Sequence, residues 1–439
     1  MLEGFTQPKL IGRMKEKMGE LTDSRTGKNT QYKMEDAGMG AFSVFFTQCA
    51  SFLEHQETLK KAKGKRNAES IFGVMHIPSA NQIRNMLDPV TPEVLNGMYR
   101  EIFNRLEKAE IIKGMRSFSN KVLIALDGTE YFSSKKIQCD KCSHRTLKNE
   151  EINHYHGVIT PVIVQSGNEH VICLEPEFII PQDGKEKQDC EIEAAKRWVR
   201  KHGAYYTSKG VILLGDDLFS RQPFCQLIKH TGLHFILVCK PDSHEMLYKT
   251  VKFLENNGTL STYAVRGWNG KQGEIYTYRY ANDLPLNGEP NAMLVNWCEL
   301  TITDEETGAF VYRNAFVTDF DVLETTVEAI ARDGRSRWKI ENENNNVLKT
   351  KGYHLEHNFG HGSQFLASFF LSLNLLAFLF HTVLNLVDMR YKLLRQILRK
   401  RELFFHDINA LLRYIVFNNW DHLLDFMITG LEIEIPSSA

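Results

Sequence analysis

Two aspartates in the sequence stand directly after short apolar runs, where the chain is expected to leave a buried strand. Asp127 follows KVLIAL, and Asp216 follows GVILLG. Such runs are typical of buried strands, and side chains at the ends of neighbouring strands converge at one edge of a sheet. Two carboxylates that lie close together repel one another unless a cation neutralises them. Because Mg²⁺ prefers oxygen ligands, the pattern favours a magnesium site.

A third carboxylate on a helix covering this edge would complete the ligand set, and Glu341 in SRWKIENENNN is the candidate. Such a site suits phosphodiester cleavage, because two metal ions about 3.5–4 Å apart can activate the attacking hydroxyl and stabilise the leaving oxygen. This chemistry needs no Ser or Cys nucleophile. An acid at a strand end is also an ordinary turn residue, so the prediction rests on the three positions together and on the sequences around them.

Three segments resemble, in this order, the motifs of the DDE transposases of bacterial insertion sequences: LIALDGTE, VILLGDDLFSRQPF and RSRWKIENENNNVLKTKGYHLEHNFGHG. In the second motif of that family an aromatic residue follows the Asp by three positions, as Phe219 follows Asp216 here. In the third motif an Arg precedes the catalytic Glu by four positions, as Arg337 precedes Glu341, which places both on one face of a helix. The three motifs are specific when taken together.

These two spacings bear on the choice between neighbouring acids. Asp217 is adjacent to Asp216, and Glu343 lies near Glu341, so each is an alternate ligand. The spacing to the aromatic residue favours Asp216, and the spacing to the arginine favours Glu341. The resemblance therefore implies that Asp127, Asp216 and Glu341 hold two Mg²⁺ or Mn²⁺ ions.

The stretch between the second and third motifs, from about Leu247 to Phe316, has a β-rich pattern. Asn269-Gly270 is a strong hairpin signal, and a second turn is expected around Thr307-Gly308. This stretch resembles the insertion that marks one branch of the family. The resemblance therefore covers about Lys121 to Val387.

Two positions depart from that branch. It often carries a Tyr three residues before the Arg, where this chain has Gly334. It often carries a Lys seven residues after the Glu, where this chain has Leu348, followed by Lys349 and then Lys351. We therefore expect Arg337, Lys349 and Lys351 to share the contacts with DNA phosphates.

Two tryptophans of the β-rich stretch, Trp268 and Trp297, are candidates for stacking on a DNA base. Related transposases that form hairpin DNA ends stack a flipped base on an aromatic residue. Trp297 lies in an apolar strand, which favours core packing. Trp268 lies beside a turn and is the candidate for contact with DNA.

The resemblance implies an RNase H-like α/β catalytic domain that cuts DNA at the ends of a mobile element and joins the freed 3′ ends to target DNA. Its expected partners are double-stranded DNA, as terminal inverted repeats and as target, and further copies of the chain in a homodimer or larger synaptic assembly. A metal-dependent nuclease using the same site without strand transfer is one alternative. A non-catalytic DNA-binding protein derived from a transposase is another, and the three intact acids argue against it.

A second metal site is predicted from Cys139 and Cys142, whose spacing in QCDKCSHR is that of a zinc knuckle. A structural Zn²⁺ needs four ligands. Candidates for the other two are His144, His154, His156, Cys173 and Cys190. The alternative is a pair of reduced cysteines in a loop. The histidines of GYHLEHNFGHG, which are His354, His357 and His361, are left outside the catalytic set, since local hydrogen bonds or phosphate contacts account for them.

Composition sets the broad class of the protein. With 439 residues, 43% hydrophobic and 24% charged, the chain is expected to fold into two or three globular domains. The net charge of −1 argues neither for nor against a DNA partner, because local basic stripes matter more than the sum. Two runs of basic residues could form such stripes: Lys60, Lys61, Lys63, Lys65 and Arg66, and then Arg390, Lys392, Arg395, Arg399, Lys400 and Arg401. Either run alone is also explained as a solvent-exposed face.

Location is predicted from the cysteines and the apolar segments. Eight scattered cysteines do not make a disulfide framework, and MLEGFTQPKLIGRMK lacks the apolar core of a signal peptide. We expect a bacterial cytoplasmic protein that associates with the nucleoid when bound to DNA. Residues 365–387 are long enough to span a membrane, but their polar residues favour a buried core helix and no membrane partner.

The sequence predicts five regions. Residues 1–118 form a helical region expected to bind DNA ends, and residues 119–246 form the first part of the catalytic domain. Within that part, KVLIAL, GVILLG and HFILV are predicted as buried strands, GVITPVIVQ as a further strand, EIEAAKRWVRKHG as a helix, and Asp127-Gly128 as a turn. Residues 247–316 are the β-rich insertion. Residues 317–387 are the second catalytic part with the Glu341 helix, and residues 388–439 are a C-terminal helical tail.

Overall fold

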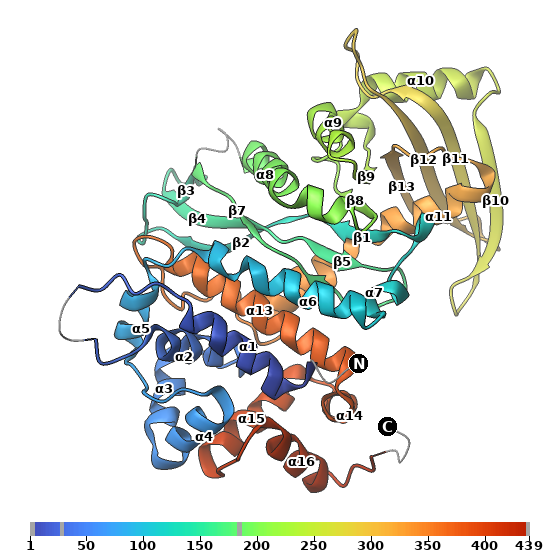
Figure 1. Cartoon of the computed structure of the whole chain (residues 1–439). Coiled ribbons are helices and arrows are strands. Elements are labelled where there is room, and N and C mark those ends of the chain that lie inside the picture. Colours follow the sequence, from blue (N-terminus) through green and yellow to red (C-terminus); the bar gives the residue numbers. More distant parts are fainter. Residues whose placement is uncertain (1–4, 27–29, 182–186, 436–439) are drawn as a thin grey trace.

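The computed structural model describes residues 5–26, 30–181 and 187–435, and it combines a large mixed sheet with a helical body (Figure 1). The predicted α/β class is confirmed. The sheet has nine strands in the order β10-β11-β12-β13-β9-β8-β1-β5-β6. Their bounds are β1 Val122–Ala125, β5 Val162–Val164, β6 Ile172–Cys173, β8 Val211–Gly215, β9 His234–Val238, β10 Ser261–Trp268, β11 Gly273–Pro285, β12 Leu294–Asp304 and β13 Phe310–Thr318.

The centre of the sheet is formed by the three apolar runs predicted as buried strands. β1 pairs in parallel with β8, and β8 pairs in parallel with β9. Every residue of β1 and β8 is buried, as expected for strands covered on both faces. Figure 1 shows α8 (Lys187–Thr207) and α9 (Gln222–His230) on one face, and α6 (Asn96–Lys108) and α13 (Leu366–Val387) on the other.

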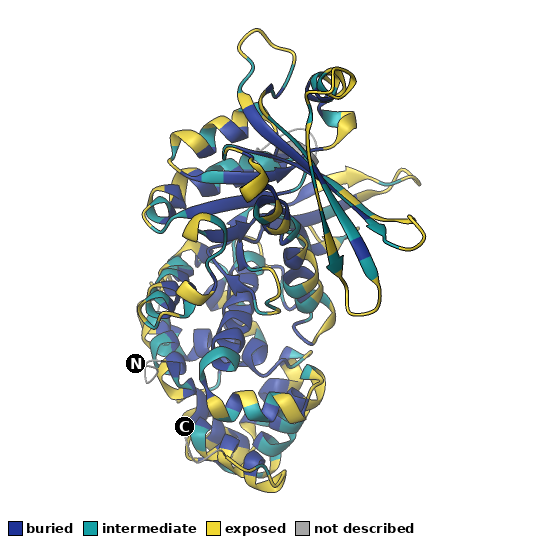
Figure 2. Ribbon diagram, turned by 90° about the vertical axis from the view of Figure 1, so that its right-hand side faces the viewer, coloured by how far each residue is buried: buried dark blue, intermediate teal, exposed yellow. Residues whose placement is uncertain are grey.

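The β-rich stretch extends this sheet and does not form a sheet of its own. It begins with a helix, α10 (Glu245–Asn256), where the sequence pattern predicted β structure. Strands β10 to β13 then form an antiparallel meander, and β13 joins β9 with Phe316 opposite Val238. The hairpin around Asn269-Gly270 is the predicted one, and its tip is exposed where the strands leave the body of the protein (Figure 2).

A second, smaller sheet starts where the sequence predicted a turn. Gly128 begins β2 (Gly128–Ser134), which pairs with β4 (Ile152–Ile159), and β4 pairs in turn with β3 (Ser143–Thr146) and β7 (Glu177–Phe178). The chain therefore passes at Asp127 from one sheet directly into another. GVITPVIVQ, predicted as one strand, is divided between β4 and β5 at Pro161, which has no N–H to donate to a ladder.

The helical body is built from both ends of the chain. Its helices are α1 Gln7–Gly19, α2 Met34–Phe46, α3 Phe52–Lys60, α4 Ala62–Phe72, α5 Ala80–Leu87, α6, α7 Ile111–Gly114, α13, α14 Met389–Ile397, α15 Arg401–Tyr414 and α16 Trp420–Gly430, with a 3₁₀ turn η2 at Pro92–Leu95. Helix α2 packs on α13, α15 on α4 and α16 on α1. The predicted N-terminal region and C-terminal tail thus share one core.

Helix α13 is the centre of this body. It is the one described helix that is long and apolar enough to cross a membrane, and 83% of its most apolar window is buried in the protein. Aromatic side chains of α2 contact it, with Phe42 against Phe380 and Phe45 against Phe370 at ring distances of 5.6 and 5.7 Å. Its apolar surface is therefore covered by other helices, as a core helix requires.

Helix α11 (Glu324–Arg335) leads to the segment that carries Glu341, and two residues fix its position. The buried Asp333 carboxylate accepts hydrogen bonds from the Ser117 hydroxyl (2.5 Å) and the Phe118 N–H (3.0 Å). Ser117 directly precedes η3 (Phe118–Asn120), and Phe118 is its first residue. Gly334 approaches the sheet so closely that a Cβ would lie 2.6 Å from the Phe316 ring. A side chain has no room there, which explains the glycine at this position.

We expect Gly334→Ala to destabilise the protein by about 1–3 kcal/mol, because the added methyl overpacks the contact between α11 and the sheet. The control is Gly12→Ala in α1, where a Cβ meets nothing within 4 Å and the better helix propensity of alanine should stabilise by about 0.5–1 kcal/mol. Urea unfolding measures both changes. A Gly334→Ala protein as stable as the control variant would contradict the close approach.

Candidate functional site

The parallel ladder between β1 and β8 places Asp127 beside Asp216. Val122 is opposite Val211 and Ala125 is opposite Leu214 in this register. Two residues further along each strand, the same register brings the two aspartates to equivalent positions at the carboxyl edge of the sheet. The adjacency predicted from the apolar runs is therefore present in the structure.

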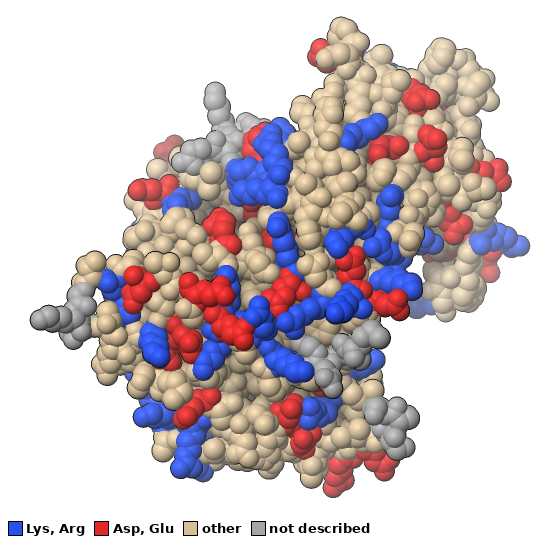
Figure 3. Space-filling view, in the orientation of Figure 1, with Lys and Arg blue, Asp and Glu red and all other residues tan. Residues whose placement is uncertain are grey.

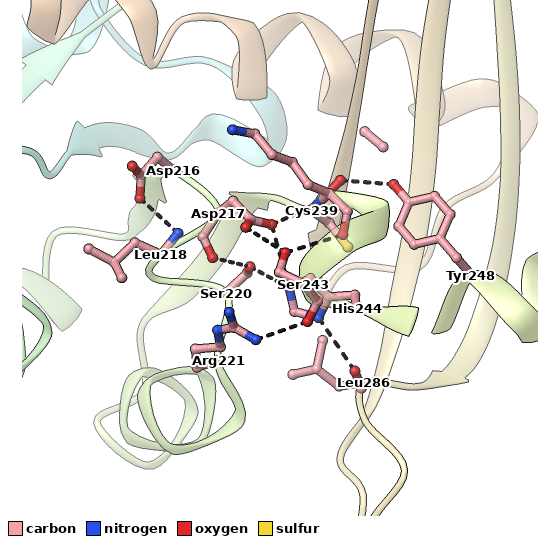
Figure 4. A network of polar contacts seen from close by, with 12 residues as sticks. Asp216, Asp217, Leu218, Ser220, Arg221, Cys239, Ser243, His244, Tyr248 and Leu286 are labelled. Atoms are coloured by element: carbon pink, nitrogen blue, oxygen red, sulfur yellow. Dashed lines mark hydrogen bonds and ion pairs between the residues drawn. The ribbon is translucent and has the colours of Figure 1, made fainter. Parts of the chain in front are cut away.

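Asp217, the alternate to Asp216, has a different set of partners. Its carboxylate accepts hydrogen bonds from the Lys240 N–H (2.7 Å) and the Ser243 hydroxyl (2.5 Å). Figure 4 shows it directed into this network, whereas Asp216 lies outside the network and accepts only the nearby Leu218 N–H, at 2.9 Å. Asp217 thus fastens the loop after β9, and Asp216 is the acid available at the sheet edge.

Glu341 lies on η6 (Ile340–Asn345), a π-helical turn followed by α12 (Asn346–Thr350). π-Helical turns are rare in proteins, and those that occur are often found at functional sites. Its carboxylate forms an ion pair of 2.7 Å with Arg337, as the spacing of four residues predicted. The Arg337 side chain is 18% exposed and that of Glu341 is 50% exposed, so the arginine is half-buried and the glutamate extends further into solvent.

The carboxyl groups of this site sense one another's charge. Burial raises the pKa of Asp127 to about 7. Arg337 opposes this increase, whereas the negative charges of Asp216, Glu341 and Glu191 add to it. Burial also raises the pKa of Asp216, again opposed by Arg337. One arginine therefore acts on all three predicted acids.

Glu191 is a fourth acid that the sequence did not single out. It lies on α8, which was predicted only as a helix, and its carboxyl carbon comes so close to Gly128 that a Cβ there would lie 2.7 Å away. Only the packing of α8 against the start of β2 brings it near Asp127. No local sequence signal marks such a contact.

The donor set fits hard divalent cations. The repulsion that Asp216, Glu341 and Glu191 exert on the Asp127 carboxylate is relieved when a cation binds these groups. Among the described residues, the one group of three or more Asp, Glu, His or Cys ligand atoms lying within 4.8 Å of one another is elsewhere, so these acids do not form a closed shell around a single ion. A pair of ions spans a more open set of this kind.

The asparagine run after Glu341 holds Asp127 in place. The Asn345 side-chain amide donates to Asp127 Oδ2 at 2.8 Å. Asn345 is in turn held by Asn344 and Thr160, whose side chains donate to its carbonyl oxygen at 2.9 and 3.2 Å. This buried network joins the segment of the third acid to the first acid. The repeated asparagines in ENENNN are the only sequence signal for it, and it was not recognised.

Glu343, the alternate to Glu341, faces another part of the protein. It lines a cavity of about 670 Å³ together with basic side chains of the α14 region: Lys392, Arg395, Arg399 and Arg401. Glu341, by contrast, pairs with Arg337 and acts on Asp127. The two glutamates therefore belong to different sites.

The remaining residues predicted to contact DNA have varied surroundings. Lys349 forms an ion pair of 2.9 Å with Glu356, and Lys351 is exposed. Leu348, where the related branch often has a lysine, is fully buried, so a charge there would be costly. Trp268 is 68% exposed at the end of β10, whereas Trp297 is completely buried in the core.

A cluster of two cysteines and two histidines lies apart from the acids. The ligand atoms of Cys139, Cys142, His156 and His361 all lie within 4.8 Å of one another. The Cys-x-x-Cys pair was predicted, and His156 was among the proposed partners. His361, which was left aside as a local hydrogen-bonding residue, supplies the fourth side chain. The other proposed partners, His144, His154, Cys173 and Cys190, are not members of this cluster.

Scans of the sequence against known protein families and against curated proteins found no match. Functional assignment therefore rests on the geometry of these two sites and on the three sequence motifs.

We expect Asp217→Ala to destabilise the protein by about 1–3 kcal/mol, because it removes two hydrogen bonds, from the Lys240 N–H and the Ser243 hydroxyl, each worth about 0.5–1.5 kcal/mol. Asp216→Ala should leave stability unchanged or increase it, because a raised pKa means that folding disfavours the ionised carboxylate. Urea unfolding at pH 7 without divalent ions compares the two. Equal losses in both variants would show that the two acids do not have separate roles.

Proposed function

We propose that this protein is a DDE transposase of the RNase H-like class, which cuts DNA at the ends of a mobile element and joins the ends to target DNA. The observations that support the proposal are the register of β1 and β8, which brings Asp127 and Asp216 to equivalent positions, and the ion pair of Arg337 with Glu341, whose charges both act on Asp127. The five strands β6-β5-β1-β8-β9, antiparallel on one side of β1 and parallel on the other, support the RNase H-like architecture.

Asp127, Asp216 and Glu341 would hold two Mg²⁺ or Mn²⁺ ions. When bound, such a pair supplies activation of the attacking oxygen and stabilisation of the leaving oxygen in phosphodiester cleavage. Asn345 keeps the Asp127 carboxylate in a fixed orientation, and Arg337 keeps Glu341 near the aspartates. Lys349 and Lys351 would contact phosphates, and the exposed Trp268 would stack on an unpaired base, a contact worth about 1–3 kcal/mol.

A polyanionic partner is supported by the basic cavity beside Glu343. Lys392 and Arg399 line it, and neither forms an ion pair with any described residue. His381 and Tyr391 also line this cavity, and the buried Tyr391 hydroxyl has no hydrogen-bond partner among the described residues. Cations and polar side chains that line one hollow are suited to phosphate oxygens.

The face of the protein shown in Figure 3 differs from the basic cavity, because acidic and basic residues are mixed on it. Blue and red atoms alternate across its middle, and no basic patch dominates there. Ion pairs among α1, α6 and the turn after α8 account for this balance, among them Arg13 with Glu101 at 2.8 Å and Lys209 with Glu107 at 2.6 Å. DNA is therefore expected at the α14 region and along the carboxyl edge of β1 and β8, in a homodimer or larger synaptic assembly that cuts two ends together.

We expect Asp127→Asn, Asp216→Asn and Glu341→Gln each to lower cleavage by roughly 10³-fold, because metal-ion catalysis is worth several kcal/mol. The assay incubates the full chain and Mg²⁺ or Mn²⁺ with the DNA that flanks its gene. Glu343→Gln is the matched control, because this acid lies away from Arg337 in the basic cavity; it should retain cleavage, with DNA binding unchanged or tighter because a negative charge is lost. Full activity in the Glu341→Gln protein would remove that residue from the site.

Pre-cut ends incubated with a target plasmid separate transposition from simple hydrolysis. A transposase gives joined products in the presence of Mg²⁺ or Mn²⁺. A protein that cleaves without joining is instead a metal-dependent nuclease. A protein that binds these ends but does neither is a DNA-binding descendant of a transposase.

We expect the double variant Lys392→Ala with Arg399→Ala to bind duplex DNA more weakly and with a shallower dependence on salt. Each lost phosphate contact lowers the slope of log affinity against log salt by about 0.9. Arg390→Ala is the control, because this arginine of the same helix already pairs with Asp421 and Asp425. Equal loss in the control would indicate that general charge, and not the cavity, determines binding.

A further inference from the structure

We propose that Cys139, Cys142, His156 and His361 bind one structural Zn²⁺ ion, which fastens the small sheet to the chain segment that follows Glu341. The proposal rests on the contacts of these four side chains and is independent of DNA chemistry. Its consequence for catalysis rests on the function proposed above.

Five of the six distances between the ligand atoms match a tetrahedron around zinc, and the sixth, between Cys139 and His361, lies within 4.8 Å. Zn–S bonds of about 2.3 Å and Zn–N bonds of about 2.0–2.1 Å imply edges of roughly 3.8 Å between two sulfurs, 3.6 Å between sulfur and nitrogen, and 3.3 Å between two nitrogens. The two cysteine sulfurs lie 3.9 Å apart. His156 Nε2 lies 3.7 and 3.4 Å from these sulfurs, and 3.1 Å from His361 Nε2. His361 Nε2 lies 3.4 Å from the Cys142 sulfur.

The supporting contacts orient these side chains toward a common centre. His361 Nδ1 lies 2.8 Å from the Gly362 carbonyl oxygen, so its N–H donates there and Nε2 is left as the ligand. The Cys139 N–H donates to the Cys142 sulfur at 3.4 Å, and the Cys142 N–H donates to the Cys139 carbonyl at 3.0 Å. This tight turn presents both sulfurs on one side, as closed structural zinc sites require.

The soft sulfur and nitrogen donors of the cluster favour Zn²⁺ over Mg²⁺. Two thiolates and two imidazoles form a complete tetrahedral set for Zn²⁺, with no position left for a reacting water. Cys142, His156 and His361 are buried, and a buried cluster of four such groups without an ion would leave polar atoms poorly paired. The site is therefore structural, and it is chemically distinct from the carboxylates that suit Mg²⁺.

The position of the cluster links the chain segments of two acids. Cys139 and Cys142 lie between β2 and β3, and His156 lies on β4, in the small sheet that begins directly after Asp127. His361 lies between α12, which follows Glu341, and α13. Zinc would therefore close a loop between the surroundings of the first and third acids, and its loss would release both.

The test is the zinc content of the full chain purified under reducing conditions. We expect about one Zn²⁺ per chain by mass spectrometry, and cobalt substitution should give the intense visible absorption of a tetrahedral thiolate site. His361→Ala should weaken zinc binding by more than about 100-fold in competition with a chromophoric chelator, since even loss of a supporting hydrogen bond costs 10–100-fold. The exposed neighbour His357→Ala should bind zinc normally.

A conservative variant keeps the test informative if His361→Ala does not fold. His361→Cys restores a fourth soft ligand and should retain zinc. Chelation should lower the melting temperature of the native protein, and added Zn²⁺ should restore it. Less than about one-tenth zinc occupancy in the native chain, with no cobalt spectrum, would overturn the site. Asp127→Asn should retain zinc, because this residue is not a zinc ligand. A native protein that binds zinc but does not cleave DNA would contradict the proposed function and leave the zinc site intact.

Discussion

Burial of the carboxyl groups at the ends of β1 and β8 is the constraint on which the arrangement of this protein depends. Burial, with a smaller effect of neighbouring negative charge, raises the pKa of Asp127 to about 7, and Arg337 only partly offsets this. Burying such a group costs folding free energy, and groups with shifted pKa values are concentrated at functional sites. The apolar strands that carry the acids, the arginine beside Glu341 and the asparagine network around Asp127 all hold like charges together that would otherwise separate.

The sequence predicted the centre of the fold because its signals are local. KVLIAL, GVILLG and HFILV are apolar runs that can be satisfied only in a buried sheet, and they form β1, β8 and β9. The small sheet was missed because TEYFSS lacks such a run and because Asp127-Gly128 resembles a turn. Gly128 serves instead for close approach to Glu191, a tertiary contact that local sequence does not reveal.

The same distinction applies to the sites. The Arg337–Glu341 pair and the Cys139–Cys142 pair follow from spacing along one short segment. His361 joins the cysteines across 219 residues from Cys142, and Asn345 reaches Asp127 across 218 residues. Those partners are set by the packing of sheets and helices. Spacing along the sequence therefore predicted the pairs that lie close together in the chain, and it did not predict partners that only the tertiary fold brings near.

The shared core of the two chain ends has a consequence for synthesis of the protein. Phe42 of α2 packs against Phe380 of α13, and Phe46 packs against Trp420 of α16. At a translation rate of about 5–20 residues per second, the first helices would wait roughly 20–70 s for these partners to leave the ribosome. During that interval the apolar faces of α2 are available to chaperones or to other nascent chains. The helical body can therefore assemble only after the chain has been made as far as α16, more than 370 residues after α2.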